Sequence, residues 1–387
     1  MRKRIYLDNA ATTPVDLRVL KEMMPYFNEK YGNPSSAHFL GRETSKALDL
    51  ARKRVADFLD CSSLEVFFTG SATEANNLAI LGLIRSFQKR GKKKIHIITS
   101  KIEHPAVLKV FHFLEKEGIK TTYVSVNKEG LVNVPEIEKS ITKDTILISI
   151  MYANNEIGVI QPIKKISKIA KKNKIYFHTD AVQAINYLDC NVKKLGVDFL
   201  TLSGHKIYGP KGAGALFVRD GIKIEPLIFG GGHERGLRPG TENVPSIVGL
   251  GSAISKIKEK DKKKVLKLRD KLIIGILKSV PRVYLNGSFK ERLPNNANFS
   301  FDGVEGESII LSLDQKGIAA STGSACSSKG LKASHVLLAL GHSQKKADSS
   351  LRLSLGRYNT ERDIEKVLKV LPGIISKLRK ISGYSLI

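Results

Sequence analysis

The chain has 387 residues, of which 42% are hydrophobic, and its 64 Lys and Arg against 37 Asp and Glu give a formal net charge of +27. Because apolar residues recur throughout, this composition excludes a disordered chain, and no apolar run approaches the roughly 20 residues that a membrane-spanning helix needs. The three cysteines are scattered and form no C-x-x-C pair, so they indicate neither a disulfide framework nor a cysteine zinc site.

Short β-rich runs alternate with helical patterns between residues 65 and 220. Strands are predicted at residues 65–69, 95–98, 145–151, 175–179 and 199–203. Helices are predicted at 72–90 and at 105–117, where a proline opens the helix. This alternation predicts an α/β fold, with a mostly parallel central sheet covered by helices on both faces.

The pattern changes after about residue 250. We predict two long amphipathic helices separated by a lysine-rich stretch at 256–264. A strand at 298–301, a helix from 305, strands near 318 and 351 and a last helix near 360 follow. We therefore expect an N-terminal arm (1–13), a large domain (14–250) and a smaller α+β C-terminal domain (251–387). Helices within 14–59 would pack on the small domain or bridge the two domains.

The positive charge allows two interpretations: an acidic partner such as tRNA or an acidic protein, or a lysine-rich solvated surface. The basic runs are dispersed and mostly lack aromatic neighbours, which favours the solvated surface and no direct nucleic-acid binding. We expect a cytoplasmic protein, since no signal-peptide hydrophobic region follows the basic N-terminus and the cysteine count fits a reducing compartment.

Ligands of a parallel sheet lie at the carboxyl ends of its strands, so the residues that follow each strand are candidates. After the first strand comes 70–74 (GSATE), in which Ser71 and Glu74 predict a capping box. Ala72 and Thr73 are small and leave the N–H groups of the new helix open to a phosphate. An ordinary helix cap is an equal alternative, and no nucleotide-binding glycine motif accompanies the stretch.

Asp180 ends the predicted strand at 175–179. A carboxylate at the end of a buried strand costs free energy unless a cation meets it. The protonated ring nitrogen of pyridoxal phosphate is such a cation, and its protonation makes that cofactor an electron sink. A buried carboxylate satisfied by the protein alone is an equal alternative.

Lys206 lies in the stretch 203–212 (SGHKIYGPKG), directly after the strand at 199–203. A lysine among glycines and small polar residues can be desolvated and brought to a carbonyl, as a Schiff base requires. Ser203 and His205 can reach the same phosphate. Because the chain is rich in lysine, a single lysine is not informative by its type. Lys206 is a candidate because of its position directly after the strand.

Cys326 lies in the stretch 321–330 (STGSACSSKG), which has almost no side chain that could anchor it in a core. We therefore expect a mobile loop and an exposed thiol. Both properties suit a nucleophile that must move, and the alternative is a tolerated loop cysteine.

These residues resemble the cysteine desulfurases of the aminotransferase class V group, which are pyridoxal-phosphate enzymes of fold type I. The resemblance runs nearly end to end. Its motifs follow in order at 6–13 (YLDNAATT), 103–104 (EH), 154–158 (NNEIG), 180–183 (DAVQ), 203–206 (SGHK), 230–234 (GGGHE), 324–326 (SAC) and 354–357 (SLGR). The extended loop around Cys326 is similar to that of the housekeeping and nitrogen-fixation branch.

The resemblance implies that Lys206 carries the cofactor and that His104 stacks on its ring and shuttles protons. Asp180 would pair with the ring nitrogen and Gln183 would bind the ring hydroxyl. The other implied cofactor contacts are Ala72, Thr73, Asn155, Ser203, His205 and Thr241. Thr241 would come from a second subunit, so a homodimer is implied.

Asn155 and Arg352 would bind the substrate carboxylate, which matches the planar fork of arginine. The implied reaction converts L-cysteine to L-alanine and leaves a persulfide on Cys326. That sulfur would pass to an acceptor such as an iron–sulfur scaffold or a tRNA thiolase. No resident metal is implied, although Cys326 could contact a nascent iron–sulfur cluster.

Three alternatives stay open. A selenocysteine lyase or a related class V transaminase would share the cofactor site, but a transaminase has no use for Cys326. A non-enzymatic RNA-binding or scaffold protein would explain the charge, but it would not need the set of Lys206, Asp180 and His104.

Overall fold

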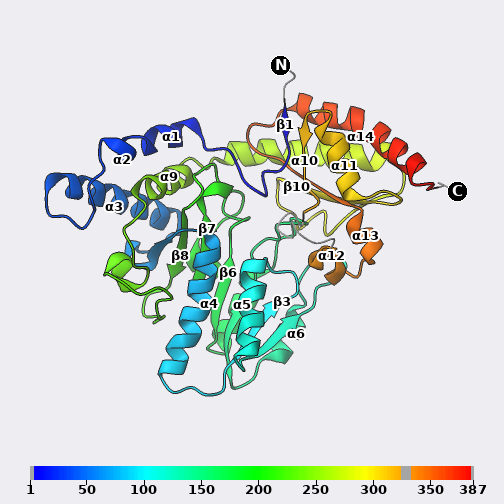
Figure 1. Cartoon of the computed structure of the whole chain (residues 1–387). Coiled ribbons are helices and arrows are strands. Elements are labelled where there is room, and N and C mark those ends of the chain that lie inside the picture. Colours follow the sequence, from blue (N-terminus) through cyan, green and yellow to red (C-terminus); the bar gives the residue numbers. More distant parts are fainter. Residues whose placement is uncertain (1–3, 324–332, 385–387) are drawn as a thin grey trace.

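The computed structural model describes residues 4–323 and 333–384. Its largest sheet has seven strands in the order β2-β8-β7-β6-β5-β3-β4 (Figure 1). In chain order they are β2 (Val66–Thr69), β3 (His96–Ser100), β4 (Lys120–Val124), β5 (Thr145–Ser149), β6 (Tyr176–Asp180), β7 (Phe199–Ser203) and β8 (Gly214–Val218). Strand β8 runs antiparallel to both of its neighbours, β2 and β7, and the other strand pairs of this sheet are parallel, so the predicted mostly parallel sheet is confirmed.

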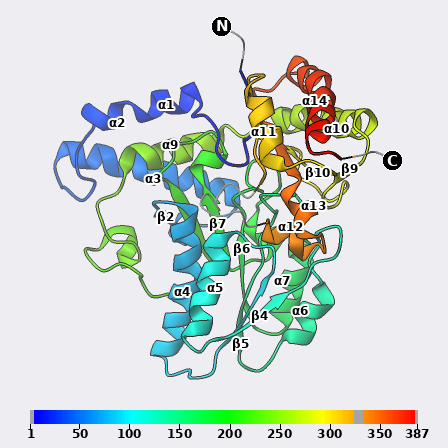
Figure 2. The ribbon, with the colours of Figure 1, turned by 45° about the vertical axis from the view of Figure 1, so that its right-hand side comes forward.

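Helices cover both faces of this sheet, because successive strand residues point to opposite sides. Ile97 and Leu147 pack in the core under α4 (Ala72–Lys89) and α5 (Pro105–Lys116). Ile98 and Ile148 pack in the core of the other face, which includes α7 (Ile163–Lys172) and α8 (Val192–Leu195). Figure 2 shows α6 (Val134–Ser140) beside α7. Burial on both faces explains the nearly continuous apolar runs of these strands.

The elements predicted between 65 and 220 are confirmed. Each predicted strand corresponds to β2, β3, β5, β6 or β7, and each predicted helix to α4 or α5, with bounds that differ by at most two residues. The edge strand β4 and the antiparallel strand β8 had not been predicted.

The N-terminal helices pack on α9 (Val244–Ser255). They are α1 (Leu17–Met23), α2 (Pro25–Asn28) and α3 (Phe39–Leu59). Two glycines of α9 permit this close packing: a Cβ on Gly249 would lie 2.5 Å from Met23 Sδ, and one on Gly251 would lie 2.7 Å from Ala51 Cα. The prediction of an amphipathic helix here is wrong, because ten of the twelve residues of α9 are buried. The predicted boundary at residue 250 falls inside this helix.

The C-terminal part is built on an antiparallel sheet of β9 (Val283–Leu285), β10 (Asn296–Phe301) and β12 (Ser350–Ser354), in the order β12-β10-β9. Its helices are α10 (Glu259–Ser279), α11 (Gly306–Asp314), α12 (His335–Ala339), α13 (Gln344–Asp348) and α14 (Glu361–Ile381). The N-terminal β1 (Ile5–Tyr6) pairs with β11 (Ile318–Ala319), so the start of the chain is tied to this part. Among the described helices, none combines the length and apolar character needed to cross a bilayer.

Candidate active site

A cavity of about 250 Å³ lies at the carboxyl ends of β6 and β7 and the N-terminus of α4. It collects side chains from segments far apart in the sequence, from Ala10 to Arg352. The predicted site residues that line it are Ala72, Thr73, His104, Asn155, Asp180, Gln183, Ser203, His205, Lys206 and Arg352. Of the other two predicted residues, Thr241 is exposed and is not part of this lining, and Cys326 lies outside the described residues.

Lys206 ends the short 3-10 turn Gly204–Lys206 that follows β7. Its ammonium group donates to the backbone oxygens of Ala10 and Ala11, with N–O distances of 2.7 Å in both cases. Gln183 Nε2 donates to the same oxygen of Ala10 at 2.9 Å. The N-terminal arm therefore holds both side chains at the cavity wall.

Asp180 is the last residue of β6, and only 6% of its surface is exposed. Its two carboxylate oxygens accept from Asn76 Nδ2 at 2.7 Å and from the Val182 N–H at 3.0 Å. Both donors are neutral, so the negative charge is hydrogen-bonded but these bonds do not neutralise it. A cationic group in the cavity would complete the site.

His104 is the N-cap of α5, and its Nδ1 accepts from the Ala106 N–H at 3.1 Å. In the neutral ring, the proton is therefore on Nε2. Burial lowers the pKa of His104, and the charge of Asp180 acts in the opposite direction. Burial also lowers the pKa of His205 to about 4, and its Nδ1 lies 3.1 Å from Thr12 Oγ1. Near neutral pH, both rings can donate or accept a hydrogen bond without carrying a charge.

The N-terminus of α4 forms one end of the cavity. Ser71 is its N-cap and accepts from the Glu74 N–H at 3.1 Å. The predicted capping box is only half formed, because Glu74 accepts from the Gly70 N–H at 2.9 Å and pairs with Arg238 at 2.8 Å instead. Helix α4 begins at Ala72. As at any helix start, the backbone N–H groups of its first turn have no carbonyl partner within the helix, and they suit an anion.

Arg352 lies in β12 with 2% of its surface exposed. Nη2 pairs with Asp8 Oδ1 at 2.8 Å, and Nη1 donates to the Asn155 backbone oxygen at 2.8 Å. Its buried Nε has no hydrogen-bond partner in the described part of the chain. Arg352 is thus held firmly at the cavity while one of its donors remains available.

Several lining residues had not been predicted, and Asn76 matters most among them. It is 1% exposed, donates to Asp180, and has a buried Oδ1 without a partner among the described residues. Asn76 lies four residues after Ala72, so both residues lie on the same face of the helix. This spacing could have predicted that Asn76 faces the site. Glu103, in the predicted motif at 103–104, is fully buried; this burial raises its pKa to about 8.

The comparisons with known proteins agree with this geometry. The aminotransferase class V model matches residues 5–367. The chain is 52% identical over 387 residues to the cysteine desulfurase IscS of Clostridium botulinum strain Hall, covering 99% of this chain and 97% of that protein. It is 53% identical over 383 residues to the IscS of Methanosarcina thermophila, covering 98% of this chain and 94% of that protein.

Solved structures give the same result. A NifS-like protein with 41% identity superposes with a TM-score of 0.91, covering 97% of this chain and all of that one. A structure described as SspA in complex with cysteine has 39% identity and a TM-score of 0.82, covering 92% of this chain and all of that one. The chain belongs to the aminotransferase class V family and, within it, to the cysteine desulfurases, which depend on pyridoxal phosphate.

Proposed function

We propose that this chain removes the sulfur atom of L-cysteine, releases L-alanine and carries the sulfur as a persulfide on Cys326. The observation that carries the proposal is one cavity that brings together an amine (Lys206), a carboxylate (Asp180), a neutral imidazole (His104) and a buried guanidinium (Arg352). A relative of known structure contains cysteine, which supports the choice of substrate.

The cavity fits pyridoxal phosphate. Among the described residues, the donors that Asp180 accepts from are neutral, so its carboxylate suits a protonated ring nitrogen, while the start of α4 suits a phosphate. When bound, the cofactor supplies an electron sink for negative charge that develops on the substrate. Lys206 would hold it covalently, and Gln183 would bind its ring hydroxyl. The phosphate would be held by Ala72, Thr73, Ser203, His205 and, from a second subunit, Thr241.

The chain's own residues would divide the remaining work. Arg352 and Asn155 would orient the substrate carboxylate. The amine of Lys206 and Nε2 of His104 would move protons at the substrate carbon atoms, and burial keeps His104 neutral for this task.

The Cys326 thiolate would form a bond to the substrate sulfur. The carbon–sulfur bond would break with its electron pair left on the substrate carbon, which a proton then converts to alanine.

The wider role follows from the family. We expect a homodimer, a cytoplasmic location and a sulfur acceptor such as an iron–sulfur scaffold protein or a tRNA thiolase.

The test is the product balance. The purified chain is loaded with pyridoxal phosphate and given L-cysteine with a thiol reductant, and alanine and sulfide are measured. We expect equal amounts of both, no product from Lys206→Ala, and normal turnover from Lys223→Ala, which removes an exposed lysine. Formation of a keto acid without sulfide would indicate a transaminase and contradict the proposal. A turnover rate with selenocysteine far above that with cysteine would indicate a selenocysteine lyase.

A further inference from the structure

The turn that follows Lys206 contains a left-handed backbone conformation that residues other than glycine rarely adopt. Tyr208 has a φ of 67° and is 1% exposed. A bulky residue is strained there, and glycine would not be. The contacts that hold this conformation include a hydrogen bond to the Tyr208 hydroxyl, and the residue lies two positions from the amine that faces the cavity.

Backbone contacts fasten this turn to the N-terminal arm. The Tyr208 N–H donates to Thr13 Oγ1 at 2.8 Å, and the Asp16 N–H donates to the Tyr208 oxygen at 3.0 Å. At the other end of the turn, Thr13 Oγ1 donates to the His205 oxygen at 2.9 Å. This arm also supplies the two carbonyls that accept from Lys206 Nζ.

The side chain of Tyr208 is clamped by the segment that follows β12. Its hydroxyl accepts from the Arg357 N–H at 2.7 Å, and the Arg357 guanidinium lies 3.6 Å from the centroid of its ring. Arg357 Nη1 also reaches Asp16 Oδ2 at 3.2 Å. Gly356 leaves room for the hydroxyl, because a Cβ there would come within 2.6 Å of it.

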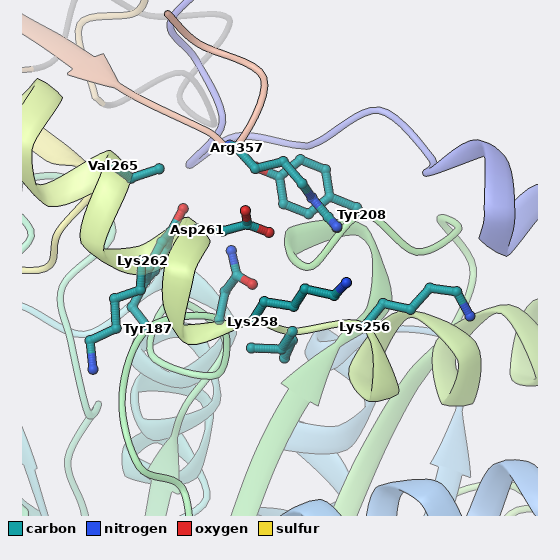
Figure 3. Close-up of a pocket in the computed structure, with 10 residues that line it drawn as sticks. Tyr187, Tyr208, Lys256, Lys258, Asp261, Lys262, Val265 and Arg357 are labelled. Atoms are coloured by element: carbon teal, nitrogen blue, oxygen red, sulfur yellow. The ribbon is translucent and has the colours of Figure 1, made fainter.

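Figure 3 shows Arg357 over Tyr208 beside a small recess that Asp261 and lysines of the α9–α10 connection also line. The recess has a volume of about 10 Å³, which leaves room for one water molecule at most. The cluster is therefore a packed joint between the N-terminal arm, the Lys206 turn and the segment after β12, and it is too small for a ligand.

We infer that Tyr208 is a positioning residue: clamped by Arg357, it holds the turn and the N-terminal arm that present the Lys206 amine to the cavity. This inference rests on the proposed function of Lys206 as the cofactor lysine. If the clamp is lost, φ of Tyr208 can relax. The contacts with Thr13 and Asp16 then weaken, and the carbonyls that fix Lys206 Nζ move with the arm. Arg352 lies five residues before Arg357 in the sequence, so the same joint connects the two sides of the cavity.

The test uses the holoenzymes of Tyr208→Phe, which keeps the ring, and Arg357→Lys, which keeps the charge but loses the planar stack. Tyr358→Phe is the matched control, because it removes a hydroxyl of the same cluster from a ring that is 55% exposed. Three quantities are measured: the melting temperature, the pH midpoint of the visible absorbance change that reports protonation at the Lys206 nitrogen, and kcat and KM for L-cysteine.

In both test variants we expect the pH midpoint to move by about half a unit or more. We also expect kcat to fall about tenfold while KM stays within about twofold of the wild type, because misplacement of a reacting group acts on the chemical step. The control should match the wild type. Borohydride reduction followed by peptide mapping separates this inference from the proposed function: a wild type without cofactor on Lys206 would refute both. With cofactor on Lys206, an unchanged midpoint and kcat in both test variants, whatever their melting temperatures, would overturn the inference.

Discussion

Asp180 and Asn76 show what single residues reveal in the sequence and what they hide. Asp180 was predicted because an acid at the end of a buried strand needs a partner. Asn76 was not predicted, because an amide inside a helix has the same appearance in a sequence whether it faces solvent or a cavity. Its 1% exposure and its 2.7 Å contact with Asp180 identify its place.

Arg352 illustrates a second limit at this scale. The sequence, through its resemblance to a family, predicted an arginine in the site. Its pairing with Asp8, 344 positions earlier in the chain, depends on the parallel placement of the N-terminal arm beside β12. No local pattern contains such a contact.

Replacement of Asp180 by asparagine tests the role of its charge. An amide oxygen can still accept from Asn76 and Val182, so we expect the fold and the cofactor to be retained. Turnover should fall at least about 100-fold, because an amide does not hold a proton on the ring nitrogen as a carboxylate does. Asp189→Asn, at an exposed carboxylate, is the control. Near-normal turnover of Asp180→Asn with full cofactor occupancy would refute this role.

At the scale of elements, the buried strands were predicted well because each is a short apolar run followed by small or polar residues. The helix α9 was mispredicted for a physical reason. A helix that is buried on all sides has no polar face. The spacing of its apolar residues therefore does not indicate that α1 and α3 cover it.

The sheet contains a buried polar ladder that predicts a pH dependence of stability. In β6, His178 Nδ1 lies 2.8 Å from Ser149 Oγ of β5, and His178 Nε2 lies 3.1 Å from Thr201 Oγ1 of β7. Burial lowers its pKa to about 3. In the unfolded chain the ring takes a proton below about pH 6.5, whereas in the folded chain it stays neutral to a much lower pH. The free energy of unfolding therefore falls as the pH drops from about 6.5 toward 3.

We expect His178→Gln to make the free energy of unfolding less dependent on pH. Between pH 6 and 4, urea unfolding should give a slope that is smaller by up to about 1.4 kcal/mol per pH unit, which corresponds to one proton. Thr201→Val removes a partner without removing a titrating group, so it should lower the free energy by a similar amount at every pH. Parallel curves for the wild type and His178→Gln would contradict the prediction.

At the scale of the whole molecule, the strand order could not be read from the sequence. The antiparallel β8 lies between β2 and β7 because of long-range pairing, and no local signal specifies it. The fold class was nevertheless predictable, since strand–helix alternation leaves few ways to bury both faces of a sheet.

A homodimer is predicted from the role that the family gives to Thr241. Two observations support it: Thr241 is exposed and does not line the cavity of its own chain, and α1 to α3 expose large apolar side chains, among them Leu17 at 79% and Phe27 at 58%. Sedimentation should give twice the chain mass. Thr241→Ala should keep that mass but lose cofactor more readily on dialysis. A fully active monomer would contradict both expectations.

Mapping the cysteines by mass spectrometry after one turnover decides where the sulfur of L-cysteine goes. Burial raises the pKa of both Cys61 and Cys190, so these two thiols are poor nucleophiles near neutral pH. We expect one added sulfur atom on Cys326 in the wild type and in Cys61→Ala, matched by one alanine per active site. Cys326→Ala should bind the cofactor and form no alanine. Alanine formation by Cys326→Ala at the wild-type rate, or an added sulfur atom on Cys61 or Cys190 in place of Cys326, would contradict the proposed reaction.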